Sequence, residues 1–369
     1  MSGKWRVGLI GLSGGAESVR EALLAEPRVR LVAVADHDAK VAASQAEATG
    51  AEAYTDCRSL IVEQKLDALF VATPHFATHG YLKLAAANGV PVWKQTPPGR
   101  RFDEALTLVR VFERAGNGGC PLVIARPWSA EPALQQARKT LTELGRPFLA
   151  EARIFCCRPE DLDWRGDSES AGAGVLLHEG FEAIDTIIHW MGRPTEVYAA
   201  TARASRPQTR YPYDTEDTAT MILKYADGAL ASLTCCWTSG PPISELTIRS
   251  TGGTVRIDPK RVTVLDRAGQ PMRAAFDRAA NPYTHPIRAF LDGHFRGQGP
   301  LASLARDHLW TMAVMETAYL SSRTGEAELP AKWFEVLSAE EKEAPPPPRE
   351  PDAPSAATAP QPPPDTSVA

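Results

Sequence analysis

The chain lacks the features that mark membrane proteins, nucleic-acid-binding proteins and secreted disulfide scaffolds. No apolar run reaches the roughly 18 residues that a membrane-spanning helix needs. The 40 basic side chains are scattered and outnumbered by 45 acidic ones, so a net charge of −5 offers no basic patch to nucleic acid or to an anionic membrane. Residues 1–6 lack the apolar core of a signal peptide and lead directly into an expected strand.

The six cysteines suggest neither a disulfide framework nor a zinc site. Four of them form two adjacent pairs, and no Cys-x-x-Cys motif is present. Reduced thiols and a cytoplasmic location are therefore expected. With 369 residues, of which 43% are hydrophobic and 23% charged, the chain has the size and composition of a globular enzyme with two domains and a tail.

Short apolar runs alternate with helical patterns over the first part of the chain. Strands are expected at residues 5–10, 30–35, 66–72, 90–93 and 121–125, and helices at 16–24, 39–48, 78–87 and 102–114. Continuous Val, Ile and Leu runs separated by helices are typical of a parallel sheet covered on both faces. We therefore expect residues 1–127 to form an α/β Rossmann domain with a doubly wound parallel sheet.

The pattern changes after residue 127. Helices expected at 131–144 and 175–191 precede alternating segments at 195–204, 218–225, 229–237, 246–250 and 254–257, and helices follow at 286–295 and 306–323. Strands in direct succession indicate an antiparallel sheet, so residues 128–335 are expected to form an α+β domain with an open, mostly antiparallel sheet. Residues 336–369 contain ten prolines and almost no large apolar side chains, which predicts a disordered tail.

The first strand ends in a glycine-rich turn that suits a dinucleotide pyrophosphate. In the motif G-x-G-x-x-G/A, Gly11 and Ala16 match the first and third places, whereas Ser13 replaces the second glycine. Gly14 and Gly15 keep the turn open. Backbone amides and the amino terminus of the following helix would bind the pyrophosphate. A tight strand-to-helix turn also recruits glycine without any ligand, so the weight of the motif comes from its position after the first strand.

Asp36 ends the second strand, where a carboxylate can accept hydrogen bonds from the adenosine ribose hydroxyls. Its charge would repel the 2′-phosphate of NADP, so NAD is the expected cofactor and NADP is less favoured. Alternatively, Asp36 caps the helix that begins near residue 38. Further cofactor contacts are expected at the same carboxyl edge of the sheet, after the next two strands, from Thr73, Pro74, Gln95 and Thr96.

Together these segments resemble the Gfo/Idh/MocA family, named after glucose–fructose oxidoreductase and inositol dehydrogenase. The similar segments are VGLIGLSGG, LVAVADHD, DALFVATP, EDTATMILKYADGALASL at 216–233 and IRAFLDGHFRGQGP at 287–300, and the resemblance spans residues 4 to about 330. It implies tight NAD or NADP binding and hydride transfer from a sugar, cyclitol or related polyol. It also implies a homo-oligomer formed through the second domain's sheet.

The resemblance breaks at the first of two catalytic motifs. Family members carry Glu-Lys-Pro after the fifth strand, whereas this chain reads Gln95-Thr96-Pro97. A threonine hydroxyl is too weak an acid to replace lysine near neutral pH, although it can hydrogen-bond a substrate. Lys94 lies two residues before Thr96, on the same face of an extended strand. It either supplies the missing ammonium group or is an ordinary lysine at a strand end.

The second family motif, Asp-x-Gly-x-His-x-x-Asp, is also altered. His178 replaces the first aspartate, Glu182 replaces the histidine, and Asp185 matches. One continuous helix would place these side chains and His189 on one face. We expect His178 to transfer the proton, with its basicity raised by Glu182, while Glu182 and Asp185 orient it and hold substrate hydroxyls. No metal site is expected, because residues 178 and 189 lie roughly 16 Å apart along a helix, and one helix cannot bring three ligands together.

Three functions remain open for this polar face. The chain is a redox enzyme with a relocated acid–base pair, a degenerate paralogue that binds nucleotide or a sugar-like ligand without turnover, or a catalyst of non-redox, metal-assisted elimination, hydrolysis or epimerisation. A purely structural polar helix is the remaining interpretation. Possible substrate contacts are His75, Arg126, Trp128 and the segment at 164–167, which in the family often passes near the substrate.

Overall fold

The computed structural model describes residues 4–116, 119–158, 161–203, 212–272, 275–297 and 304–335. Residues 1–331 form one compact unit and residues 332–369 a second, and every helix and strand given below belongs to the first. The predicted tail at 336–369 lies outside the described residues, as does residue 204 at the end of one expected strand. The predicted domain boundaries stay predictions.

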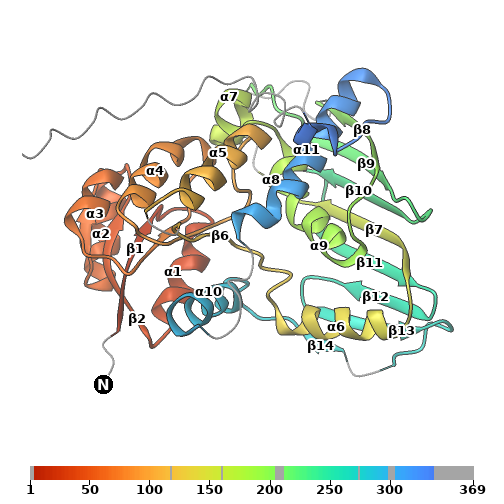
Figure 1. Ribbon diagram of the computed structural model, residues 1–369, viewed down its shortest axis with the longest axis horizontal. Coiled ribbons are helices and arrows are strands. Elements are labelled where there is room, and N and C mark those ends of the chain that lie inside the picture. The colour runs from red at the N-terminus through yellow and green to blue at the C-terminus, as the bar shows by residue number, and fades with distance from the viewer. Residues whose placement is uncertain are drawn as a thin grey trace, which may run out of the picture. The chain divides into compact units, whose positions relative to one another are not determined.

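A six-stranded sheet forms the amino-terminal part of the compact unit (Figure 1). Its order, β3-β2-β1-β4-β5-β6, is that of the dinucleotide-binding fold, and all neighbouring strands are parallel. The predicted doubly wound α/β sheet is therefore confirmed. The strands are Trp5–Ile10 (β1), Val29–Ala35 (β2), Glu52–Tyr54 (β3), Ala68–Val71 (β4), Val92–Lys94 (β5) and Leu122–Ile124 (β6).

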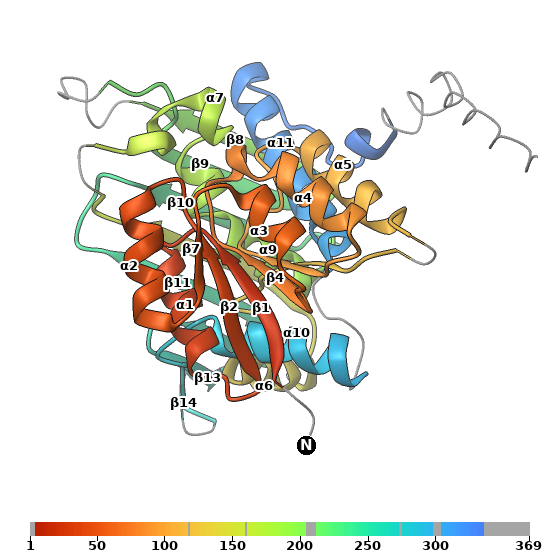
Figure 2. The ribbon, with the colours of Figure 1, turned by 90° about the vertical axis from the view of Figure 1, so that its left-hand side faces the viewer.

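Helices cover both faces of this sheet. Figure 2 shows α1 (Ala16–Leu24) and α2 (Ala39–Thr49) on one side of the strands, with α3 (Cys57–Glu63) and α4 (His79–Ala87) on the other. Helix α5 (Phe102–Glu113) packs beside α4, and α10 (Thr284–Arg296) packs beside α1. Thus a helix from far along the chain completes the core of the first sheet, where the rings of Phe70 and Phe290 meet edge to face at 5.7 Å.

The second sheet has eight strands in the order β14-β13-β12-β11-β7-β10-β9-β8. Only β7 and β10 pair in parallel, so the predicted open and mostly antiparallel sheet is confirmed. The sequence analysis missed the central strand β7, although its buried and exposed residues alternate as in the others. The strands are Pro147–Phe155 (β7), Glu196–Ala202 (β8), Thr218–Lys224 (β9), Leu230–Cys236 (β10), Ile243–Ser250 (β11), Gly253–Ile257 (β12), Arg261–Asp266 (β13) and Phe276–Asp277 (β14).

Among the helices that pack on the second sheet are α6 (Pro132–Glu143), α9 (Phe181–Met191) and α11 (Leu309–Thr324) (Figure 1). The short helix α8 (Val175–His178) also contacts β9 and β10. Strand residues that point toward them, such as Val197, Met221 and Leu233, are buried. No helix within the described ranges is long and apolar enough to cross a membrane. All six cysteines lie in those ranges, and each is a free thiol.

The expected continuous helix at 175–191 is wrong in one respect. It consists of α8 (Val175–His178) and α9, separated by Glu179 and Gly180. A Cβ atom at Gly180 would lie 2.6 Å from the Leu176 carbonyl oxygen and 2.8 Å from Leu233 Cδ2 of β10. This close approach to the sheet leaves space for glycine alone, and a helix commonly kinks at such a residue. His178 and Glu182 therefore belong to different helices and do not share one continuous face.

Candidate active site

A cavity of about 1190 Å³ lies beyond the carboxyl ends of β1, β2, β4 and β5. Residues of β7, β11, α8 and α9 line its other wall. Ligands of open α/β sheets bind at this edge, where the strand order reverses between β1 and β4. Pockets for small ligands usually measure roughly 300–1,000 Å³, so this cavity is large enough for a dinucleotide and a second molecule together.

The glycine-rich turn has the geometry that a dinucleotide requires. Gly11 has a φ of +88°, and a Cβ atom there would lie 2.7 Å from the carbonyl carbon and oxygen of Ala72, so only glycine fits. Ser13, Gly14 and Gly15 line the cavity, and Gly15 is the N-cap of α1 without a side chain to block the helix terminus. The turn therefore presents backbone and a helix amino terminus to an anion, and these residues fit a pyrophosphate.

Asp36 lies at the end of β2 with its carboxylate buried beside this turn. Its Oδ2 accepts a hydrogen bond from the Leu12 N–H at 3.0 Å, and its Oδ1 accepts one from the Asp38 N–H at 3.1 Å. Asp38, and not Asp36, caps α2, because its own carboxylate accepts from the Lys40 N–H at 2.8 Å. Asp36 is thus tied to the turn at the position where a ribose would lie.

Two further cofactor candidates follow β5. The Gln95 side chain donates a hydrogen bond to the Gly15 carbonyl oxygen at 3.1 Å and so joins this loop to the glycine-rich turn. Thr96, which stands where the family has lysine, lines the cavity beside it. Thr73 and Pro74 line the cavity at the end of β4, where the Thr73 hydroxyl hydrogen-bonds the Tyr81 hydroxyl. All nine predicted cofactor residues therefore lie around one cavity.

Lys94 is fully buried behind this wall. Its Nζ donates to the carbonyl oxygens of Gln95 at 3.1 Å and Pro97 at 2.6 Å, and it lies 3.0 Å from His75 Nδ1. Burial lowers the pKa of Lys94 to about 7. Of this pair, His75 lines the cavity and Lys94 does not. The ammonium group is thus held against a histidine and does not reach a ligand directly.

His178 is surrounded by aromatic rings. Its imidazole stacks on His75 with centroids 5.6 Å apart, stacks on Trp237 at 6.2 Å, and meets the Trp164 ring edge to face at 5.2 Å. Its Nε2 is buried, and the described residues offer that atom no hydrogen-bond partner. Burial, followed by the charges of Arg165 and Arg158, lowers the pKa of His178 to about 3.

These features overturn the expected His178–Glu182 pair. Glu182 was expected to raise the basicity of His178, but the pKa of His178 moves in the opposite direction. The reason is first the burial of the imidazole and then the charges of Arg165 and Arg158, while the break after α8 takes Glu182 off the helix that carries His178. The imidazole is therefore neutral in the working pH range. It can donate or accept a hydrogen bond, but it is a weak base.

Glu182, unlike His178, has a pKa close to the working pH. Its Oε1 accepts a hydrogen bond from the Thr96 hydroxyl at 3.2 Å, and both residues line the cavity. Burial raises the pKa of Glu182 to about 7, against the smaller lowering effect of the Thr96 hydrogen bond. The Tyr283 side chain lies nearby and hydrogen-bonds the Gln95 side chain. A carboxyl group with a pKa near the working pH can accept and release a proton.

Asp185 does not line this cavity, and its carboxylate is fully used in a buried network. Arg126 donates to it twice, at 2.6 and 3.1 Å, Thr311 donates at 2.8 Å, and His308 Nδ1 lies at 3.2 Å. Burial alone would raise the pKa of Asp185, but His308 and Arg126 outweigh it and hold that pKa below its usual range. The expectation that Asp185 orients His178 or binds substrate hydroxyls is therefore not met. It anchors α9.

His189, the fourth member of the expected polar face, is also separate from the cavity. Its Nε2 lies 2.8 Å from Arg138 Nη1 on α6. Within the described ranges, no cluster of three or more His, Cys, Asp or Glu side chains is placed to hold a metal ion.

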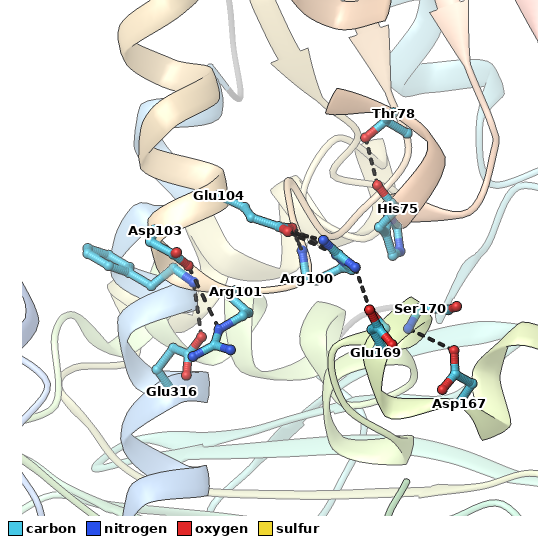
Figure 3. Close-up of polar contacts among 11 residues, drawn as sticks. His75, Thr78, Arg100, Arg101, Asp103, Glu104, Asp167, Glu169, Ser170 and Glu316 are labelled. Carbon is cyan, nitrogen blue, oxygen red and sulfur yellow. Dashed lines mark hydrogen bonds and ion pairs between the residues drawn. The ribbon is translucent and has the colours of Figure 1, made fainter. Parts of the chain in front are cut away.

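The loop after β5 is clamped to the segment that leads into α8 (Figure 3). The Arg100 guanidinium binds Glu104 at the start of α5 and also donates to the carbonyl oxygen of Glu169 on α7 (Ser168–Ala171). On the neighbouring turn, the Phe102 N–H donates to Glu316 of α11 at 3.0 Å. These contacts fix Thr96 relative to the helices that carry His178 and Glu182.

Several residues of the cavity wall were absent from the predicted site. Sequence reasoning noted Arg165 only as part of a segment near the substrate and did not single out the others; the set is Arg158, Arg165, Glu179 and Tyr283. Trp237, which stacks on His178, lies outside this lining. The four lining residues come from strand ends and loops without a recognisable motif. The alternation of β7 would have shown that Arg158 follows the end of a strand.

Comparison with known proteins agrees with this arrangement. Residues 5–118 match the model of the oxidoreductase family with an NAD-binding Rossmann fold, and residues 134–256 match the GFO/IDH/MocA C-terminal domain. D-apiose dehydrogenase from Paraburkholderia graminis is 26% identical over 335 residues, which cover 82% of this chain and 85% of that protein. Inositol 2-dehydrogenase from Rubrobacter xylanophilus is 24% identical over 327 residues, which cover 86% and 91%.

Solved structures show the same fold. Levoglucosan dehydrogenase in complex with NADH and levoglucosan superposes with a TM-score of 0.78 at 19% identity, over 88% of this chain and 99% of that one.

Proposed function

This chain belongs to the GFO/IDH/MocA family of oxidoreductases, and we propose that it oxidises a hydroxyl of a sugar, cyclitol or related polyol with NAD as the hydride acceptor. The observation that carries the proposal is the position of Glu182. This carboxyl group lies in the cavity beside Thr96, at the motif position of the family's catalytic histidine, and its pKa is about 7. The chain thus has an acid–base group although the family's lysine and histidine are both replaced.

In this proposal the glycine-rich end of the cavity holds the cofactor. The turn from Gly11 to Gly15 binds the pyrophosphate through backbone groups, and Asp36 accepts hydrogen bonds from the adenosine ribose. The carboxylate of Asp36 would repel a 2′-phosphate, which favours NAD over NADP. When bound, the oxidised nicotinamide supplies a carbon that accepts a hydride from the substrate's carbinol carbon.

Glu182 then takes the proton from the same substrate hydroxyl. As the hydride leaves carbon, the O–H bond breaks toward the Glu182 carboxylate and a carbonyl group forms, so charge and atoms balance. The Thr96 hydroxyl, 3.2 Å from Oε1, orients the carboxylate. The neutral His178 offers its unpartnered Nε2 to a second substrate hydroxyl. Lys94 acts through His75, whose ring it fixes on the stacked face of His178.

A panel of sugars and cyclitols tests this proposal. The wild-type protein with NAD should form reduced nicotinamide with at least one member, measured by its absorbance. Glu182→Gln should lower that rate by about 10²–10⁴-fold, the usual contribution of a general base, and leave NAD binding intact. Glu143→Gln is the matched control, because this exposed glutamate lies on α6 outside the cavity lining. Bound NAD without turnover on any member would instead favour a degenerate binding protein.

The outward face of the second sheet suits a homo-oligomer. Strand residues Tyr198 and Ile222 pair across β8 and β9 on this face and are 46% and 45% exposed. We propose that two copies of the chain associate through this face, as the family resemblance implies. The cytoplasmic location remains a prediction.

A further inference from the structure

Arg165 is a partly buried cation in the cavity wall. It lies on the short helix η2 (Asp163–Gly166), where its guanidinium stacks 4.5 Å from the centroid of the Trp164 ring. Two carboxylates of the described residues, Glu179 and Asp163, act on it through their charge and without a hydrogen bond. Burial lowers the pKa of Arg165 from its ordinary value. A desolvated charge that is only partly compensated is costly to the free protein and favours the binding of an anion.

The charges around Arg165 compensate its own charge only in part: Arg158 opposes it, while Glu179 and Asp163 favour it through space. Its neighbour Arg158 is paired with Glu179, whose carboxylate also accepts a hydrogen bond from the Trp237 indole at 3.4 Å. Asp163 acts on Arg165 only at a distance and is exposed to water, which screens it. Glu182 accepts a hydrogen bond from Thr96 and is not among the charges that act on Arg165. Three arginines line the cavity: Arg58 in the first domain, and Arg158 and Arg165 in the wall near His178. Of the latter two, Arg158 is held by Glu179, so Arg165 is the one that offers its guanidinium first to an incoming anion.

Arg165 belongs to the substrate end of the cavity. Its neighbour Trp164 meets the His178 ring at 5.2 Å, and the charge of Arg165 acts directly on His178. The proposed pyrophosphate site, by contrast, is the turn after β1, which already offers backbone N–H groups and a helix terminus. The planar guanidinium fork matches the oxygens of a carboxylate or a phosphate.

We propose that Arg165, with Arg158 beside it, binds an anionic group of the substrate, so that the enzyme acts on an acidic sugar or polyol carrying a carboxylate or a phosphate. This inference rests on the proposed function, because it names the substrate class of the same site.

Equilibrium binding to the full chain loaded with NAD tests the inference independently of turnover. Glucose, glucuronate, methyl glucuronate ester and glucose 6-phosphate are titrated, with calorimetry as the readout. We expect one of the two anions to bind at least about tenfold more tightly than glucose, whereas the neutral ester should bind like glucose. The glucuronate and phosphate arms distinguish a carboxylate from a phosphate. A parallel set from inositol and its monophosphate extends the test to cyclitols.

Substitution assigns the preference to one residue. Arg165→Met keeps a long side chain on Trp164 and should reduce the preference for the anion at least tenfold, while Arg165→Lys should keep part of it. Arg193→Met is the matched control: Arg193 stacks on Trp310 at 4.7 Å in the same way but does not line the cavity. The Arg193→Met variant should prefer the anion to the same extent as the wild type.

Two results would overturn the inference: equal binding of anionic and neutral ligands by the wild type, or a preference that survives Arg165→Met. Loss of NAD affinity in Arg165→Met, with the ligand preference unchanged, would also overturn it and assign Arg165 to the cofactor. The failure of the proposed function would give different results. If anion binding depends on Arg165 but no NAD is reduced, the proposed dehydrogenase activity is refuted and the inference about Arg165 stands. If only neutral sugars are oxidised, the dehydrogenase activity stands and the inference about Arg165 is refuted.

Discussion

At the β1–α1 end of the cavity the main chain forms the site, whereas at the α8–α9 end the side chains form it. The cofactor end depends on a positive φ at Gly11, on exposed backbone groups and on one carboxylate. The catalytic end depends on the ionisation of Glu182 and His178, which burial and neighbouring charges shift in opposite directions. The backbone geometry of the glycine-rich turn tolerates few substitutions. Proton transfer at the α8–α9 end can be performed by other residues if their surroundings give them a suitable pKa.

The largest effect should come from breaking the backbone geometry of the cofactor end. Gly11→Val places a branched side chain at φ +88° and within 2.7 Å of the Ala72 carbonyl group. We expect NAD affinity to fall at least about hundredfold, with a loss of stability of roughly 3 kcal/mol or more. Calorimetric NAD titration and thermal melts measure the two effects. Gly14→Ala should have a smaller effect on both: its φ of +59° disfavours alanine, but a Cβ atom there meets no atom within 4 Å. Equal NAD affinity in the valine variant and the wild type would refute the proposal that the turn from Gly11 to Gly15 binds the pyrophosphate.

At the α8–α9 end, the ionisation of Glu182 should make the free energy of unfolding depend on pH. Because the native pKa of Glu182 is raised from 4.5 to about 7, folding favours the protonated carboxyl group. Below pH 4.5 both states carry the proton and the cost vanishes. As the pH rises from 4.5 through 7, the native state is destabilised, because it must hold an ionised carboxylate away from water. The pKa difference of about 2.5, at about 1.36 kcal/mol per pKa unit, sets an upper limit of about 3 kcal/mol on this loss of stability.

Glu182→Gln should therefore be more stable than the wild type at pH 8 and equal to it at pH 4.5. Since Glu182 is partly open to the cavity, we expect about half of the upper limit. Urea unfolding at the two pH values measures the difference. The same substitution at exposed Glu143 should show no such dependence. A glutamine variant that is less stable at pH 8 would mean that Glu182 is ionised and well solvated.

The smallest expected effect concerns the choice of dinucleotide. Asp36→Ser removes the charge that faces the ribose while keeping a short side chain to accept from the Leu12 N–H. We expect the preference for NAD over NADP to fall about tenfold, which corresponds to about 1.4 kcal/mol. Competitive titration of the two dinucleotides gives the ratio. A ratio that does not change would show that Asp36 serves only to fix the glycine-rich turn.

The same division explains what the sequence could predict. The glycine-rich turn, the position of Asp36 at a strand end and the parallel α/β class follow from local patterns, because the residues of a strand end encode its backbone geometry. The strand order and the short edge strand β3 were not predicted. Thr96 and Glu182 were found as departures from a family motif. Their contact was not predicted, since it joins residues 86 positions apart.

The roles of His178 and Asp185 could not be read from spacing alone. The pKa of His178 depends on burial and on Arg165 and Arg158, which lie on the short helix η2 and in the loop after β7. Asp185 is matched by Arg126, Thr311 and His308, which come from three different elements. A helix-face argument places such side chains on one line but says nothing about the charges opposite them. The helix also breaks at Gly180, so these residues do not share one continuous face. The break could not be predicted from spacing, because it arises from the close contact of Gly180 with β10.

The pH dependence of nicotinamide reduction tests the central claim, that Glu182 replaces the family's catalytic pair, most directly. With a saturating substrate, single-turnover rates of the wild type should rise tenfold per pH unit below about 7 and level off above it, as the carboxyl group loses its proton. Glu182→Gln should give a slow rate without this transition, whereas His178→Asn should keep it. If the transition persists in Glu182→Gln and vanishes in His178→Asn, histidine is the base and the account is wrong.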